Sequence, residues 1–260
     1  MKKLLILISI TAAAFTSCTK VINVDLKNAP PQLVIEGIVN NAIPAVVTLT
    51  QSVKFSSDNV FPTVSGANVT IQDNGGTIYT LTETSPGNYT NTSLIGASGH
   101  SYTMKVITGG VTYTAVSVMP AQVNFDTLLT DKITFGDKTI NVVKPQYKDP
   151  PAPGNNYQFV EYQNGNRLDV VYTWNDNINN GGTSNRPLIY SEDKKPDIVK
   201  GDVIKVEMRC IDANVYVYMR GLADLNSQQT TPANPTSNIS NGALGYFSAH
   251  TSQTRSVVIP

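Results

Sequence analysis

The sequence has little charge and no excess of either sign. Only 15% of its 260 residues are charged, against about 25% in an average soluble domain, and 19 basic side chains balance 19 acidic ones. A chain without a basic excess lacks the clustered Lys and Arg that neutralise phosphates, so we expect no nucleic-acid partner. Its 40% of hydrophobic residues is enough for a buried core and excludes an intrinsically disordered chain.

Long hydrophobic runs are also missing, apart from one at the N-terminus that is too short for a membrane-spanning helix. Two lysines and about a dozen apolar residues lead to Thr16-Ser17-Cys18, the layout of a secretory signal peptide. This end resembles the lipobox of bacterial lipoproteins, with Phe15 in place of the usual leucine. We therefore predict a lipoprotein signal peptide at 1–17, acylation of Cys18 and a tether at 18–29. An ordinary signal peptide with an incidental cysteine is the alternative.

Histidine and cysteine, which often carry catalysis or bind metals, are equally scarce. The two histidines, His100 and His250, have no second histidine or glutamate at the spacing of a metal motif. The sequence contains no Gly-x-Ser-x-Gly elbow and no phosphate-binding glycine loop. With Cys18 acylated, Cys210 has no disulfide partner and is expected to pack as a small buried group. We therefore expect a protein that is not an enzyme and that needs neither a cofactor nor a metal.

The first part of the chain reads as a series of short strands. Between residues 33 and 118, seven runs of β-branched and aromatic residues are separated by turn signals such as Asp73-Asn74-Gly75-Gly76. That number and spacing predict an immunoglobulin-like β-sandwich at 30–121. Tyr102 is interpreted as its tyrosine corner, in which a phenol hydroxyl binds loop backbone.

The second part begins after Pro120 and is again rich in alternating runs. From Asp212 on, apolar residues recur at helical spacing, with Asp212 as a suitable N-cap; a strand is the alternative for this segment. We predict a second β-rich unit at 122–260 with one short helix near 213–227. The fold class is therefore all-β.

Two features of this second part are candidate binding sites. The Asn-rich loop Asn175–Asn180 resembles a calcium loop, but it holds one carboxylate, and Arg186 stands where a calcium loop has its glutamate. We therefore expect a solvated turn, with calcium binding as the alternative. Flat aromatic rings beside such amides suit a partner protein first and a glycan second. For Tyr172 and Trp174, which lie two residues apart on one strand face, we favour the alternative that they fill the core. The aromatic candidates are Trp174, Tyr172, Tyr190, Tyr157 and Tyr162.

Five stretches resemble, in the same order, the domain of unknown function 4249 family, and they span nearly the whole chain after Cys18. No catalytic residues are established for that family, so none is carried over. The resemblance implies an outer-envelope lipoprotein, of a kind often encoded beside TonB-dependent outer-membrane receptors. The matching stretches are Pro30–Gly37, Val64–Ile71, Pro86–Tyr89, Gly99–Val106 and Asn234–Ala249.

These observations lead to one functional expectation and one alternative. We expect a lipoprotein held in the outer membrane by Cys18, because several acyl chains on one residue bind a bilayer firmly. The periplasmic and the cell-surface face both remain open. Its expected role is that of a non-enzymatic accessory subunit of a TonB-dependent nutrient-uptake receptor, and the alternative is a free-standing glycan-binding or adhesin-like envelope module. Asp126-Thr127-Leu128 also resembles an O-glycosylation sequon of envelope proteins, with Thr127 as the acceptor.

Overall fold

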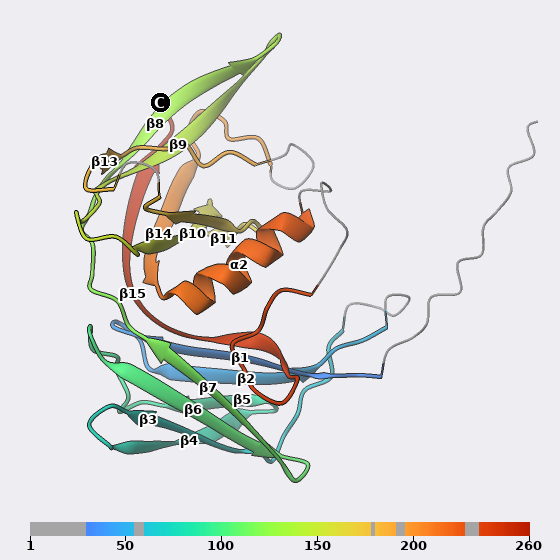
Figure 1. Ribbon diagram of the computed structural model, residues 1–260. Helices are drawn as coiled ribbons and strands as arrows, with labels where there is room; N and C mark the ends of the chain where they lie inside the picture. Colours follow the sequence, from blue (N-terminus) through green and yellow to red (C-terminus); the bar gives the residue numbers. More distant parts are fainter. Residues whose placement is uncertain (1–29, 55–59, 178–179, 191–195, 227–233) are drawn as a thin grey trace, which may run out of the picture. The chain divides into compact units, whose positions relative to one another are not determined.

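Strands make up most of the structure, a computed structural model that describes residues 30–54, 60–177, 180–190, 196–226 and 234–260 (Figure 1). The earlier strands are β1 (Leu33–Asn40), β2 (Ala45–Gln51), β3 (Asn68–Asp73), β4 (Ile78–Ser85), β5 (Asn88–Asn91), β6 (Ser101–Thr108) and β7 (Val111–Val118). The later ones are β8 (Phe125–Phe135), β9 (Lys138–Lys148), β10 (Asn156–Gln163), β11 (Asn166–Arg167), β12 (Tyr172–Asn175), β13 (Thr183–Ser184), β14 (Val203–Ile211) and β15 (Leu244–Val258). One helix of the described chain, α2 (Ala213–Asn226), lies at the expected place. The all-β class is confirmed.

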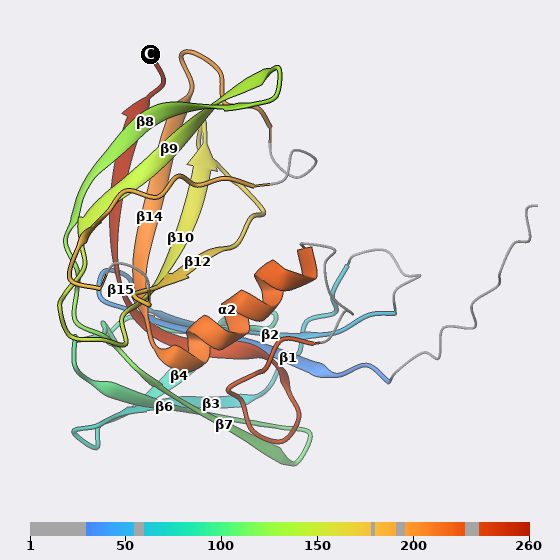
Figure 2. The same ribbon diagram turned by 45° about the horizontal axis from the view of Figure 1, so that its top comes forward.

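The strands form two sheets. The larger has the order β11-β10-β14-β15-β1-β2-β5-β4-β3-β6-β7, with β12 also paired to β10, and the smaller has the order β13-β9-β8. Strand β15 connects the earlier and the later strands within the larger sheet. Its first half pairs in parallel with β1, and its second half pairs antiparallel with β14. Figures 1 and 2 show this long strand running from the level of β1 up to β14.

Because of β15, the two expected regions share one sheet. Residues Pro31–Pro260 form one compact unit. The division at residue 121 and the narrower assignment of an immunoglobulin-like sandwich to 30–121 stay predictions. The signal peptide at 1–17, Cys18 and the tether at 18–29 lie outside the described residues.

Hydrophobic side chains gather in two large cores and a smaller cluster. The first core lies between the strands of the earlier part and includes the fully buried Ile35 and Met104. The second includes Phe159 and Trp174 of the later part. Strand β15 contributes to both, since Phe247 is in the first core and Val257 packs against the second. The small cluster lies under α2, which contacts β10, β12 and β15.

Two local expectations from the sequence are confirmed. The hydroxyl of Tyr102, a residue 2% exposed, accepts a hydrogen bond of 2.7 Å from the Ala97 amide, as a tyrosine corner does. Asp212 caps α2, because its Oδ1 accepts a bond of 2.9 Å from the Val215 amide. Its second oxygen accepts a bond from the Ser117 hydroxyl, which ties the start of the helix to β7.

Candidate functional site

A small polar depression lies where the ends of β9, β10 and β12 meet the segment around β13. It encloses about 10 Å³, the space that one water molecule needs. Two of the aromatic candidates, Tyr157 and Trp174, line it together with buried carboxylates and one cation. The complete lining consists of Tyr147, Asp149, Tyr157, Trp174, Asn175, Asp176, Ser184 and Arg186.

Asp149 forms one side of the depression and is 4% exposed. One of its oxygens accepts a hydrogen bond from the Tyr157 hydroxyl, and the other accepts a bond of 3.1 Å from the Gly181 amide. The Asp149 amide in turn donates to the Gly182 carbonyl at 2.9 Å. These bonds compensate the cost of burying the carboxylate and attach the glycine turn before β13 to the end of β9.

Asp176 lies across the depression and is 6% exposed. Its Oδ2 accepts bonds from the Asn155 amide at 2.9 Å and from Asn155 Nδ2 at 3.3 Å. Asp176 is the single carboxylate of the proposed calcium loop Asn175–Asn180, of which residues 178 and 179 lie outside the described residues. Within the described parts of the chain, no group of three His, Cys, Asp or Glu side chains could hold a metal ion. The solvated turn expected for this loop stays a prediction.

The phenols of the depression stay protonated at neutral pH. Burial raises the pKa of Tyr147 to about 12, since a phenolate is poorly solvated there, although a hydrogen bond with Ser184 acts in the opposite direction. Burial also raises the pKa of Tyr157, and the hydrogen bond to Asp149 adds to this effect. The guanidinium of Arg186 lies 4.8 Å from the centre of the Trp174 ring, on the solvent side. The site therefore presents two neutral phenols, of which Tyr157 already donates its hydroxyl to Asp149, and one cation.

The five aromatic candidates do not share one exposed face. Three of them, Tyr157, Tyr172 and Trp174, are 1%, 5% and 8% exposed, and all three belong to the second core. This burial agrees with the core alternative for Tyr172 and Trp174. Tyr190 is half-buried, and its ring packs edge-to-face against Tyr172 with the ring centres 6.2 Å apart. Tyr162 is half-buried beneath the Lys205 ammonium group, 4.0 Å from its ring centre. Their use as a ligand or partner surface stays a prediction.

The remaining sequence candidates are single residues. Cys210 is a free thiol, 4% exposed, as expected, and burial raises its pKa. Thr127 is half-buried on β8, next to a shift in the register between β8 and β9. Its O-glycosylation stays a prediction. His250 is 2% exposed, and its Nδ1 lies 2.9 Å from the Ser248 hydroxyl. Burial and then the nearby Arg209 lower the pKa of His250 to about 3, so the ring is neutral.

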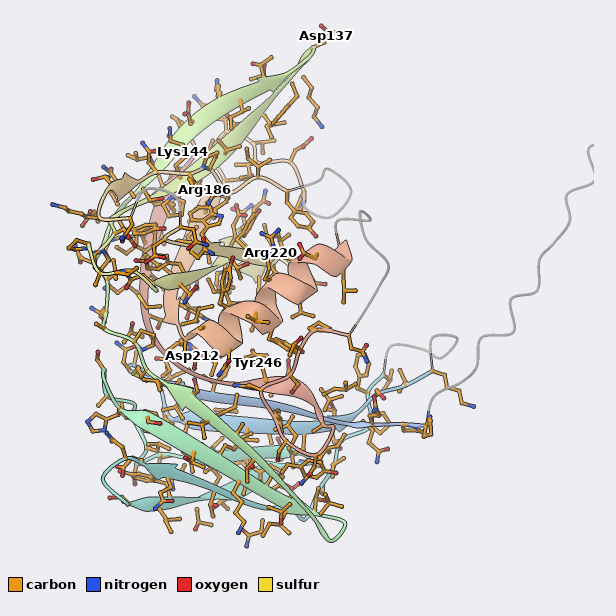
Figure 3. All side chains as sticks on the ribbon, in the orientation of Figure 1. Asp137, Lys144, Arg186, Asp212, Arg220 and Tyr246 are labelled. Carbon is orange, nitrogen blue, oxygen red and sulfur yellow. The ribbon has the colours of Figure 1, made fainter. Side chains whose placement is uncertain are left out.

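The sequence reasoning missed one prominent element, the hairpin of β8 and β9. The two strands pair without interruption from Thr127 to the turn that follows Phe135. Figure 3 shows Asp137 at the tip of the hairpin, far from the core residues at its base. The signal was present in the sequence, because Gly136-Asp137 separates two alternating runs and is typical of a hairpin turn.

The strands and their pairing into two sheets define an all-β protein in the residues that the structure describes. The family model described as "Domain of unknown function (DUF4249)" matches residues 19–256. The chain therefore belongs to this family, as its sequence motifs indicated. No curated protein matches the chain. In the described parts of the chain, no helix is both long enough and apolar enough to cross a membrane.

Proposed function

We propose that this protein is an outer-membrane lipoprotein that acts as a non-enzymatic accessory subunit of a TonB-dependent nutrient-uptake receptor. Its contribution is a docking surface. The observation that carries the docking role is the exposed β8–β9 hairpin, and the anchor is supported by the lipobox-like N-terminus. The family match begins at residue 19, directly after the cysteine proposed to carry the lipid.

The hairpin has the properties of an interaction element. Leu128 and Val142 are buried at its base, whereas no residue from 129 to 141 is buried. Phe135 near the tip is 51% exposed. Burying such a ring against a partner removes apolar surface from water, and aromatic residues are enriched at binding hot spots. The hairpin is stiffened by its own ladder and by an ion pair of 2.7 Å between Lys144 and Asp131.

A hollow beside the hairpin adds a second feature for a partner to fill. It has a volume of about 280 Å³ and lies between the β8–β9 hairpin and the last residues after β15. In the part of the chain that the structure describes, strand β8 is an edge of the three-stranded sheet, so its outward backbone groups have no strand partner in that sheet. Such an edge can accept an added strand from another protein. The hollow is lined by Thr130, Asp131, Lys132, Asn141, Ile259 and Pro260.

The test is recovery of the receptor with the full-length protein. Tagged protein is purified from membranes in mild detergent, and co-purifying proteins are identified by mass spectrometry. We expect a stoichiometric outer-membrane receptor, which Phe135→Ser reduces and Ile43→Ser leaves unchanged. Ile43 is a suitable control because it is 53% exposed, close to the value for Phe135, but lies in the turn between β1 and β2.

A Cys18→Ala variant separates the anchor from the docking role. We expect this variant to leave the membrane fraction. Absence of any partner above background would refute the accessory role. Equal recovery with Phe135→Ser and Ile43→Ser would instead show that the receptor binds elsewhere than at the hairpin tip.

A further inference from the structure

Two adjacent hydrophobic side chains in the segment before β3 are strongly exposed. Val60 is 75% exposed, the largest fraction among the large hydrophobic residues described, and Phe61 is 51% exposed. Exposed single hydrophobic residues are common on proteins. Val60 and Phe61 are instead adjacent, and they share their connection with the exposed Lys54.

This pair lies at the end of the sheet where the chain arrives from its N-terminus. The Ser52 amide donates to the Gln32 carbonyl at 2.9 Å, and the Gln32 amide donates to the Ser52 hydroxyl at 2.9 Å. The Gln51 amide donates to the Pro62 carbonyl at 2.8 Å. These bonds place the residue that follows Phe61 beside the end of β2, and the end of β2 beside the start of β1 (Figures 1 and 2).

We propose that Val60 and Phe61 insert into the interface of the bilayer that holds the lipid anchor, and that they fix the orientation of the protein there. The inference rests on the proposed acylation of Cys18. A tether at 18–29 spans at most about 40 Å when fully extended, so the anchor keeps this end of the sheet within that distance of the membrane. Hydrophobic and aromatic side chains lie favourably at the boundary of headgroups and acyl chains, where the Lys54 ammonium can bind anionic headgroups.

The position beside the tether, not exposure alone, selects this pair. Ile43 is 53% exposed and belongs to the same pair of strands, but it lies in the turn at their other end. With about 3.3 Å per residue along β1, that turn is roughly 20 Å from the Val60–Phe61 end. Because the tether enters the sheet at the Val60–Phe61 end, membrane contact there needs less extension of the tether than contact at Ile43, and a chain loses less conformational entropy over the shorter span. Ile43 supplies a matched control.

The test measures depth in the bilayer. Full-length acylated protein carrying Phe61→Trp or Ile43→Trp is reconstituted into vesicles of phosphatidylethanolamine and phosphatidylglycerol, with or without lipids brominated near the headgroup. The native Trp174 is buried in both variants and gives the same background, which also reports correct folding. We expect a blue shift on reconstitution and a loss of emission with brominated lipids for Phe61→Trp, and neither change for Ile43→Trp.

Flotation of the vesicles separates failure of this inference from failure of the anchor. If the protein floats with the vesicles and Phe61→Trp is quenched no more than Ile43→Trp, membrane insertion is wrong while the lipid anchor stands. If the protein does not float, the anchor fails, and the inference that rests on it fails as well. If a co-purified receptor shifts the emission of the introduced tryptophan in Phe61→Trp to the blue, and brominated lipids do not quench it, the pair contacts a protein partner. That result would overturn the inference.

Discussion

Strand β15 should make the two cores unfold together, and Phe247 offers a direct test. The Phe247 side chain is fully buried in the first core, while its strand continues to β14 in the second part of the molecule. Truncating a buried phenylalanine to alanine removes its transfer free energy and leaves a cavity. We therefore expect Phe247→Ala to lower the free energy of unfolding by about 3–5 kcal/mol.

The chain carries its own probe for the other core. Trp174 is the single tryptophan and belongs to the second core, so its fluorescence reports unfolding at a distance from the substitution. With a slope of about 3 kcal/mol per molar urea, the midpoint of unfolding falls by roughly 1–2 M. We expect the same fall from tryptophan fluorescence and from far-UV circular dichroism. Phe135→Ala, at a site 51% exposed, serves as the control and should change stability by no more than about 0.5 kcal/mol.

A different result would refute the reasoning. If Phe247→Ala shifts the circular dichroism transition but leaves the fluorescence midpoint of Trp174 unchanged, the two cores unfold independently. The pairing of β15 with β1 and β14 would then be a contact between two separate domains. The predicted division at residue 121 would separate two units that unfold independently.

Three smaller predictions concern single hydrogen-bonding groups. Asp212→Ala removes the cap of α2 and should cost about 1–2 kcal/mol in urea unfolding. Tyr102→Phe leaves a loop amide without its acceptor and should cost about 1 kcal/mol in the same assay, with unchanged circular dichroism of the native state. Glu83 accepts bonds from the amides of Gly66 and Gly87, which lower its pKa from 4.5 to about 2. The stabilisation from the Glu83 carboxylate is therefore present above pH 4.5 and lost as the pH falls to about 2. Between these pH values, the urea midpoint should fall less for Glu83→Gln than for the native protein.

Much of the local structure could be predicted, because its signals lie within a few residues of each other. The alternating runs predicted the strands, and Asp212 predicted the start of α2. The turn before Tyr102 predicted the hydrogen bond of its hydroxyl to loop backbone. The parallel pairing of β1 with β15 could not be predicted, since its partners are more than two hundred residues apart. Gly245 reflects this pairing, because the close approach of β1 leaves no room for a side chain. Its φ is +93°, and a Cβ there would lie 2.0 Å from the Ile35 carbonyl oxygen, but the sequence does not say which backbone comes so close.

The candidate site was harder to predict because burial depends on what covers each face of a strand. Alternation correctly placed Tyr172 and Trp174 on one face, yet it could not show that this face packs into the second core. In β10, five consecutive residues are buried, since α2 packs on one side and the second core lies on the other. A strand covered on both faces loses the alternation by which a sequence distinguishes inside from outside.

The scarcity of charge is reflected in how the structure satisfies its carboxylates. Asp149 is held by a phenol and an amide, and Asp176 by the backbone and side chain of one asparagine. Asp202, 8% exposed, accepts bonds from the Asn164 side chain at 2.8 Å, the Val199 amide at 2.8 Å and the Gln163 side chain at 2.7 Å. These neutral donors, Asn164 first, lower its pKa. Amides and phenols stabilise a carboxylate without a second buried charge, whose desolvation would be costly. A chain rich in asparagine, threonine and tyrosine can therefore bury acidic groups at the ends of its strands and still leave few charges on its surface.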